Sequence, residues 1–243
     1  MSDFPEQAAG MLERLRDARP RVYCLMNTVV QKLVADGLSA LGAIPSMTSS
    51  VDEVSAFVGK ADALVVNLGT LDDQRRQAIR LALDTARGKA KPWVLDPAHC
   101  DYSPPRAAFA QELLAYGPAV LRANASEFVL LTVPDPVVGV RTGATDLVKY
   151  GTRSLAIENG HPLTAKVTGT GCLSGAIIAA FLAVERDAFQ AAAAAMLVVG
   201  VAAEMAGETA HGPGSFEPAF LDALDRVGPT DITARARVAY AQG

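Results

Sequence analysis

The sequence predicts an α/β fold in which helices cover both faces of a largely parallel β-sheet. Short apolar runs rich in β-branched residues, such as ALVVN at 63–67 and WVLDP at 93–97, alternate with longer helical segments. This alternation is typical of parallel sheets, because a parallel connection needs a crossover segment. Half of the 243 residues are hydrophobic, which is enough for a large core. No linker or repeat divides the chain, so we expect a single domain over residues 1–243.

Each element is predicted from its own local pattern. Apolar residues at helical spacing predict a helix at 29–41, and the segment 72–87 has the polar start and apolar interior of a helix that covers a sheet. The alanine-rich segments 172–184 and 191–203 are about 13 residues long, short of the roughly 20 needed to span a membrane. We expect them to be buried helices. Further strands are expected at 119–124, 137–141 and 153–159, and a last amphipathic helix at 216–227.

Composition restricts the class of ligand and the compartment. The net charge is −4, with no basic stripe or long run of like charge, which argues against nucleic acid and membrane partners. The three cysteines, Cys24, Cys100 and Cys172, are far apart, without the spacing of a disulfide framework or a zinc site. The first 20 residues lack an apolar signal core. We expect a cytoplasmic protein with a small-molecule ligand.

Ligands of such sheets bind beyond the carboxyl ends of the strands. This rule selects Asn67, Asp96, Asn124 and Thr142, which end four of the predicted strands, together with the glycine-containing segment KVTGTGCLSGAI at 166–177. We expect these residues to lie at one edge of the sheet.

The glycine-containing segment predicts an anion site at the start of a helix. Gly169 and Gly171 let the backbone turn tightly and approach a ligand, and the helix that follows offers unpaired N–H groups to phosphate. The helix start is also expected to lower the pKa of Cys172, which would then accept a proton. A small buried cysteine that only fills the corner fits equally well. Together with Gly175, the same glycines also form a weak dinucleotide-type pattern.

Charged side chains at the strand ends suit a phosphate and its metal ion. Asp96 and Glu127 are placed to hold Mg²⁺ partly through its water shell, and Arg122 and Thr142 to contact phosphate oxygens. Glu127 follows Asn124 by three residues, so a helix-capping role is the alternative for this pair.

The histidines carry little weight as metal ligands. His161 and His211 are scattered along the chain, and His99, Cys100 and Asp101 stand too close together in sequence for a usual metal site.

The ordered motifs of the chain resemble those of the hydroxyethylthiazole kinase family, in the ribokinase-like superfamily. The matching stretches are LGAIPSM followed by DEV, NLGTL, VLDP, NASE after LR, ENGHPL, VTGTGC and GPGSF. The resemblance implies a three-layer ribokinase-like fold and ATP-dependent phosphorylation of the hydroxyl of 4-methyl-5-(2-hydroxyethyl)thiazole in thiamin salvage, with Mg²⁺. It also implies a homotrimer whose sites lie between subunits.

The same resemblance implies a role for each matching residue. Cys172 stands where related sugar kinases place an aspartate base, and Asp96 and Glu127 serve Mg²⁺. The implied thiazole-binding residues are Met47, Gly169 and Asn27, and the implied ATP-binding residues are Arg122, Thr142, Asn124, Thr170 and Gly171.

The chain also departs from the family pattern. The first predicted strand ends in YCLMN rather than HNxTN, and Asp36 replaces a usual asparagine. AHCDYSPP at 98–105 replaces a flexible glycine-rich turn. The segment 128–137, FVLLTVPDPV, is shorter than the helical excursion that family members have there, by about one βα unit of roughly 30 residues. Because a parallel connection without a crossover helix is hard to form, we expect either a rearranged sheet or a lost strand.

Three functions therefore stay open at the level of the sequence. The first is a working thiazole kinase. The second is a thiazole- or nucleotide-binding protein of the same fold with weak or lost kinase activity, which the short segment and the altered turn favour. The third is a dinucleotide-dependent oxidoreductase, which rests on the glycine spacing alone.

Overall fold

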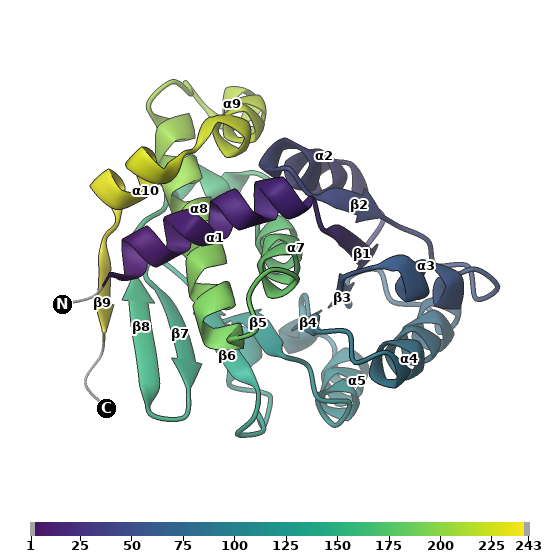
Figure 1. Cartoon of the computed structure of the whole chain (residues 1–243). Coiled ribbons are helices and arrows are strands. Elements are labelled where there is room, and N and C mark those ends of the chain that lie inside the picture. Colours follow the sequence, from purple (N-terminus) through teal and green to yellow (C-terminus); the bar gives the residue numbers. More distant parts are fainter. Residues whose placement is uncertain (1–2, 241–243) are drawn as a thin grey trace.

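The computed structural model describes residues 3–240, and a nine-stranded sheet runs through its centre in the order β2-β1-β3-β4-β5-β6-β7-β8-β9 (Figure 1). The strands are β1 Arg21–Leu25, β2 Ile44–Ser46, β3 Ala63–Asn67, β4 Trp93–Asp96, β5 Val120–Asn124, β6 Val138–Thr142, β7 Asp146–Tyr150, β8 Arg153–Ile157 and β9 Val238–Tyr240.

The sheet is parallel from β2 to β6 and antiparallel from β6 to β9. Asn67 lies beside Asp96 in the register, and Asn124 lies beside Thr142. The four strand-end residues selected from the sequence therefore share the carboxyl edge of the parallel half. The prediction of a largely parallel sheet is confirmed, with an antiparallel extension that the sequence analysis did not anticipate.

Helices cover both faces of the sheet, as predicted. Alternate residues of β1 separate into two cores: Val22 and Cys24 join one, Tyr23 and Leu25 the other. The first core is covered by α1 Phe4–Ala18, α2 Gln31–Leu41, α7 Thr170–Leu182, α8 Ala188–Gly207, α9 Pro213–Arg226 and α10 Pro229–Arg235. The second core is covered by α3 Val54–Lys60, α4 Asp73–Gly88 and α5 Pro104–Leu114.

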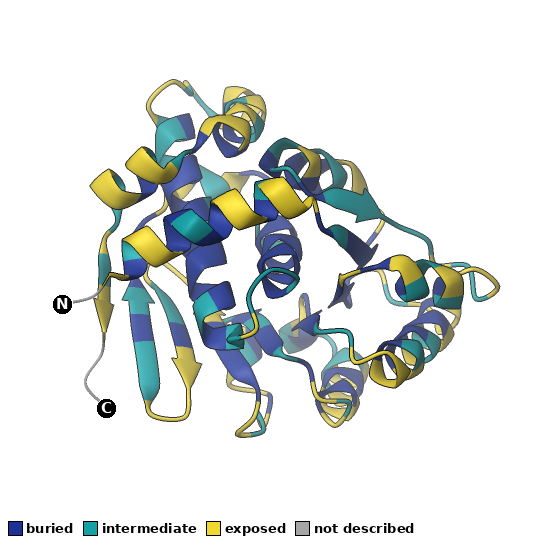
Figure 2. Cartoon of the chain, in the orientation of Figure 1, coloured by how far each residue is buried: buried dark blue, intermediate teal, exposed yellow. Residues whose placement is uncertain are grey.

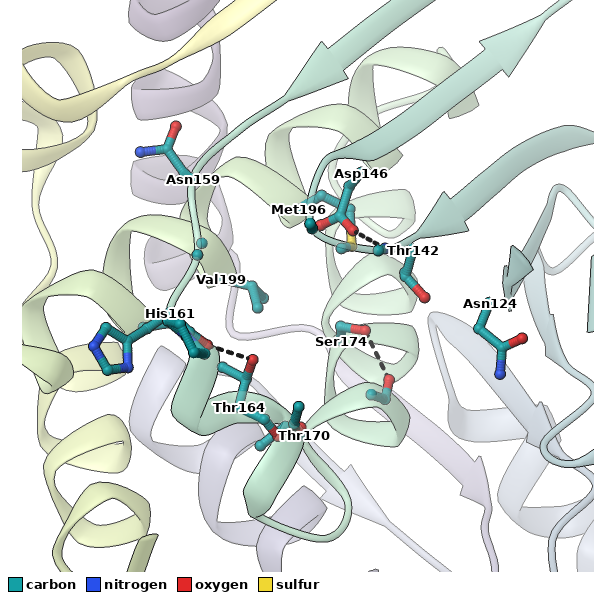
Figure 3. A pocket seen from close by; sticks show the side chains of 18 of the residues that line it. Asn124, Thr142, Asp146, Asn159, His161, Thr164, Thr170, Ser174, Met196 and Val199 are labelled. Atoms are coloured by element: carbon teal, nitrogen blue, oxygen red, sulfur yellow. Dashed lines mark hydrogen bonds between the residues drawn. The ribbon is translucent and has the colours of Figure 1, made fainter. Parts of the chain in front are cut away.

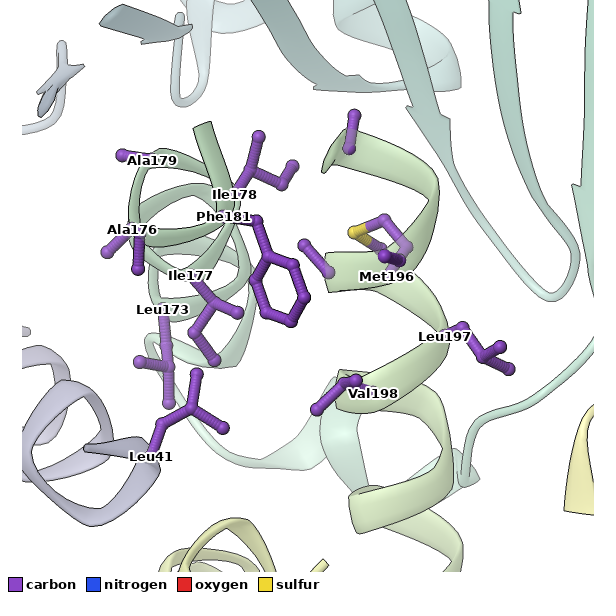
Figure 4. Close-up of a cluster of buried hydrophobic side chains, with 14 of the residues drawn as sticks. Leu41, Leu173, Ala176, Ile177, Ile178, Ala179, Phe181, Met196, Leu197 and Val198 are labelled. Carbon is purple, nitrogen blue, oxygen red and sulfur yellow. The ribbon is translucent and has the colours of Figure 1, made fainter. Parts of the chain in front are cut away.

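The two alanine-rich helices α7 and α8 are buried, as predicted, and Figure 2 shows them mostly dark blue. Phe181 of α7 lies between the two helices, with Met196 and Val198 on the α8 side (Figure 4). The predicted length of α8 was wrong, because the helix has 20 residues rather than about 13. By length and composition alone α8 is able to cross a membrane, but most of it is buried within this fold.

The short link between β5 and β6 contains only one turn of helix, α6 Ala125–Phe128. Even so, β6 pairs with β5 in parallel, with Val120 beside Val138. The expectation of a rearranged sheet or a lost strand was therefore wrong. The 13 residues between Asn124 and Val138 are just enough for a parallel connection. The ring of Phe128 lies so close to Gly139 that a β-carbon there would be 2.8 Å from it, so Phe128 covers the strand in place of a longer helix.

Candidate active site

A buried polar cluster lies at the carboxyl ends of β3 and β4. Asn67 and Asp96 are both fully buried, and Nδ2 of Asn67 donates to Oδ2 of Asp96 at 2.9 Å. The backbone N–H of Ala98 donates to the other carboxylate oxygen at 3.2 Å. Burial raises the pKa of Asp96 and the charge of Glu127 adds to this, whereas Arg122, 3.7 Å away, opposes it.

Cys172 is held against this cluster in the first turn of α7. Its sulfur accepts hydrogen bonds from Nδ2 of Asn67 at 3.3 Å and from Nδ2 of Asn27 at 3.8 Å. Burial raises the pKa of the Cys172 thiol to about 12, and the nearby charge of Asp96 adds to this effect. The prediction of a lowered pKa was wrong, because loss of solvent outweighs the lowering effects of Arg122, Asn67 and Asn27. At neutral pH the group is a thiol.

The two glycines that precede Cys172 are required by close contacts. Gly169 has a left-handed φ of +99°, and a β-carbon there would lie 2.8 Å from Cγ1 of Val30. A β-carbon on Gly171 would lie 2.6 Å from Nη2 of Arg122. The guanidinium therefore rests against the start of α7, and its Nη2 donates to Oγ1 of Thr142 at 3.3 Å. A cation and free helix N–H groups meet here, which favours an anion.

A cavity of about 840 Å³ opens beside this helix start. Its lining includes Arg122, Asn124, Thr142, Thr170 and Gly171, the five residues that the resemblance implies for ATP. Figure 3 shows Asn124 and Thr142 on one side of the cavity, His161 and Thr164 on the other, and Thr170 between them. The volume is within the usual range for a small-molecule site.

The wall opposite the strands was largely missed from the sequence. It is formed by the loop after β8 and by one face of α8, and it includes Asn159, His161, Thr164, Met196, Val199 and Ala203. The motif ENGHPL at 158–163 was a signal for the loop. The residues of α8 that line the cavity had no local signal, because they are apolar like most of that helix.

The residues implied for the thiazole lie outside the cavity lining that the described chain forms. Asn27 is buried and bonded to Asn67, and Gly169 is the N-cap of α7. Met47 follows β2 and is half-buried against the first core. The structure thus brings Asn27, Asp96 and Cys172 together with the five ATP candidates, but it does not place Met47 among them.

Glu127 has the capping role that the sequence analysis kept as an alternative. Its Oε2 accepts from the N–H of Asn124 at 2.9 Å, and Oδ1 of Asn124 accepts from the N–H of Glu127 at 2.9 Å. The other oxygen of Glu127 accepts from the N–H of His99 at 2.6 Å. Each carboxylate oxygen keeps a second lone pair, so the cap does not prevent Glu127 from binding a cation.

The turn after β4 keeps an unusual backbone without the glycines of the family pattern. Ala98 and His99 have positive φ values of 21° and 59°. Potential ligand atoms of His99, Asp101 and Glu127 lie within 4.8 Å of one another. The sequence analysis discounted His99, Cys100 and Asp101 as metal ligands because of their spacing. In the structure Cys100 is buried, and the third potential ligand beside His99 and Asp101 is Glu127, from another segment.

Arg75, which sequence reasoning missed, holds the loop after β3. It is 5% exposed, and its Nη2 donates to the carbonyl of Asn67 at 2.9 Å. Its Nη1 donates to the carbonyls of Gly69 and Thr70. Because Asn67 contacts both Asp96 and Cys172, Arg75 fixes the position of the polar cluster from behind.

The fold and this site define a ribokinase-like α/β protein with a nucleotide-sized cavity at the carboxyl edge of its sheet. A ribokinase-like superfamily protein from Enterococcus faecalis matches it with a TM-score of 0.65 at 14% identity, over 90% of this chain and 89% of the other, which is a likeness of fold alone.

A family model described as the hydroxyethylthiazole kinase family matches residues 12–135 and 134–229. A probable hydroxyethylthiazole kinase from Agrobacterium fabrum is 57% identical over 99% of both chains. The structure of a hydroxyethylthiazole kinase from Pyrococcus horikoshii matches with a TM-score of 0.93 and 34% identity, over 97% of this chain and 99% of the other. The chain belongs to the hydroxyethylthiazole kinase family.

Proposed function

We propose that the protein transfers the γ-phosphoryl group of ATP to the hydroxyl of 4-methyl-5-(2-hydroxyethyl)thiazole, as a cytoplasmic kinase of thiamin salvage. The observation that carries this proposal is the position of the cavity. It begins at Arg122 and Gly171, and the cluster of Asp96 and Cys172 lies on the other side of the same helix start. A nucleotide in the cavity would present its terminal phosphate to that cluster.

The chain's own groups divide the work of phosphoryl transfer. Arg122 and the backbone N–H groups at the start of α7 bind the phosphate oxygens, where a single well-placed donor is typically worth about 10²–10³ in rate. With its raised pKa, Cys172 is a weak proton acceptor at rest. This suits a loose transition state, in which the attacking alcohol keeps its proton until late. Most of the rate enhancement then comes from positioning and charge stabilisation.

Mg²⁺ fits the carboxylates present. Asp96 is fully buried, and burial together with the charge of Glu127 raises its pKa, so its negative charge is only partly balanced by Arg122. A bound dication would complete that balance, with Asp96 and Glu127 holding it partly through water. When bound, Mg²⁺ neutralises charge on the phosphate oxygens.

The thiazole would bind next to Cys172, in contact with Asn27, Gly169 and Met47. These residues lie outside the cavity, and Val29, close to Asn27 in sequence, is 71% exposed. This openness leaves room for a site completed by another subunit, as in the homotrimer that the family resemblance implies.

A binding protein with weak or lost kinase activity is the second candidate, favoured by the unreactive state of Cys172. The short link between β5 and β6 does not support this second candidate. The sheet is intact across the link, and the Agrobacterium relative aligns over 99% of both chains, so its length is nearly the same.

The decisive measurement is ADP release by the purified full chain with ATP, Mg²⁺ and the thiazole alcohol. We expect release to need all three, and light scattering to give the mass of a trimer. ADP release without the thiazole would contradict the kinase proposal. Calorimetric binding of both ligands without turnover would support the binding protein instead.

A further inference from the structure

His99, Asp101 and Glu127 form a compact group of metal-ligating side chains at the rim of the nucleotide cavity. They come from two segments, the turn after β4 and the single turn α6, and their potential ligand atoms lie within 4.8 Å of one another. His99 is exposed and lines the cavity, Asp101 is half-buried, and Glu127 is 3% exposed. The group therefore has an open side through which an ion can enter.

The hydrogen bonds around the group orient its carboxylate oxygens and leave lone pairs available to a metal ion. The N–H groups of His99 and Asn124 each donate to a different oxygen of Glu127, at 2.6 and 2.9 Å. Oγ of Ser126 donates to Oδ2 of Asp101 at 2.8 Å. The other oxygen of Asp101, Oδ1, is buried and has no hydrogen-bond partner among residues 3–240. A buried carboxylate oxygen without a donor is costly, and a metal ion would satisfy it.

The ligand types decide which ion fits. The two carboxylates suit Mn²⁺ and the imidazole suits ions such as Zn²⁺, both first-row divalent ions that N/O sites bind, whereas Mg²⁺ is usually held by oxygen ligands. We propose that His99, Asp101 and Glu127 bind a divalent transition-metal ion, in preference to Mg²⁺, at the rim of the nucleotide cavity. This site is separate from the proposed role of Asp96 towards nucleotide-bound Mg²⁺, although Glu127 belongs to both, and it does not depend on the kinase reaction.

The experiment adds Mn²⁺ alone to the metal-stripped full chain, without nucleotide. Electron paramagnetic resonance measures the free Mn²⁺ that remains. We expect one bound Mn²⁺ per chain that a tenfold excess of Mg²⁺ does not displace. His99→Ala and Asp101→Asn should each weaken Mn²⁺ binding at least tenfold, because changes even to the supporting partners of metal ligands typically cost about 10–100-fold.

His211→Ala and Asp135→Asn are matched controls, since both residues are exposed and lie outside this group. They should bind Mn²⁺ like the unmodified chain. The proposal is overturned if Mn²⁺ does not bind, if a tenfold excess of Mg²⁺ displaces it, or if the double variant at His99 and Asp101 binds it undiminished. Melting temperatures measured in chelator show whether each variant is folded. Mg²⁺-supported ADP release, assayed separately, tests the kinase proposal on its own.

Discussion

The pKa of the Cys172 thiol is subject to two opposing effects, the helix start and burial, and the effect of burial is larger. A helix start stabilises a thiolate by about 0.3–1 kcal/mol, or up to about 2 in favourable geometry, whereas burial can shift a pKa by several units. The result is a thiol with a pKa raised to about 12. The helix start could be predicted from the local motif, but burial depends on which residues from other segments pack around the sulfur.

The raised pKa predicts the reactivity of Cys172. Only the thiolate is alkylated, so the rate of reaction with iodoacetamide should keep rising from neutral pH to about pH 10, beyond the usual cysteine pKa of about 8.5. Mass spectrometry of the Cys172 peptide measures this rate. Cys24 and Cys100 are buried and should react more slowly in the native chain. A rate that levels off near neutral pH would show that the helix dipole dominates after all.

Met47 is predicted to contact the thiazole, because a polarisable thioether packs well on an aromatic ring. Met47→Ala should raise the thiazole KM at least about tenfold, within the range for losing an apolar contact in a pocket, and leave the ATP KM nearly unchanged. Met205→Ala is a matched control, since Met205 is also half-buried against the first core. Equal changes in both KM values, with a lower melting temperature, would give Met47 a packing role.

At the scale of the element, the start of α7 requires glycine at position 171, because a side chain there would clash with the guanidinium of Arg122. In Gly171→Ala the new methyl group would displace the guanidinium from Thr142 and Asp96. Losing a charge-assisted hydrogen bond costs about 1.5–3 kcal/mol, so we expect the ATP KM to rise roughly 10- to 100-fold. The fold should survive, because the clash is with the far end of a flexible side chain.

Steady-state kinetics with each substrate varied in turn test this prediction. Gly88→Ala is the matched control, because Gly88 ends α4 with no neighbour within 4 Å of the new β-carbon. That variant should keep both KM values. An unchanged ATP KM in Gly171→Ala would mean that Arg122 does not bind the nucleotide.

At the scale of the whole molecule, the residue just before the C-terminal strand β9 supports a wall of the cavity, although it lies beyond residue 229, where the family match ends. The N–H of Arg237 donates to Oδ1 of Asn159 at 2.7 Å, and its guanidinium pairs with Glu204. Glu204 in turn accepts from Nδ2 of Asn159 and from the N–H of Gly160, both at 3.0 Å. The loop after β8 is therefore held from behind.

Arg237→Ala should loosen that loop. Because the Arg237 guanidinium is half exposed and Glu204 keeps its bonds from Asn159 and Gly160, losing the ion pair costs about 0.2–1 kcal/mol. In a chain of this size each kcal/mol lowers the melting temperature by about 2–4 °C. We expect the ATP KM to rise and the thiazole KM to stay the same. Arg226→Ala is the control, because the Nε of Arg226 donates to the carbonyl of Asp222 in its own helix. A change in the thiazole KM alone would contradict this account.

The sequence was most informative where local pattern decides structure. The central strands and five helices, α2, α4, α7, α8 and α9, were predicted within a few residues, because their apolar runs are flanked by turn residues. The helices α1, α3, α5, α6 and α10 were not predicted. β7 and β9 were missed, since both are short and largely solvent-exposed on one side. The group of His99, Asp101 and Glu127 was missed for another reason: only the tertiary fold brings its two segments together.

The central position of α7 has a consequence for biosynthesis. This helix packs on β1, β3 and β4, which are made long before it. Some 74 residues separate Asp96 from Thr170, and at about 5–20 residues per second a ribosome needs roughly 4–15 seconds to make them. For that interval the part of the apolar face that α7 covers in the folded chain stays exposed on the nascent strands, and chaperones that bind apolar surfaces can bind there.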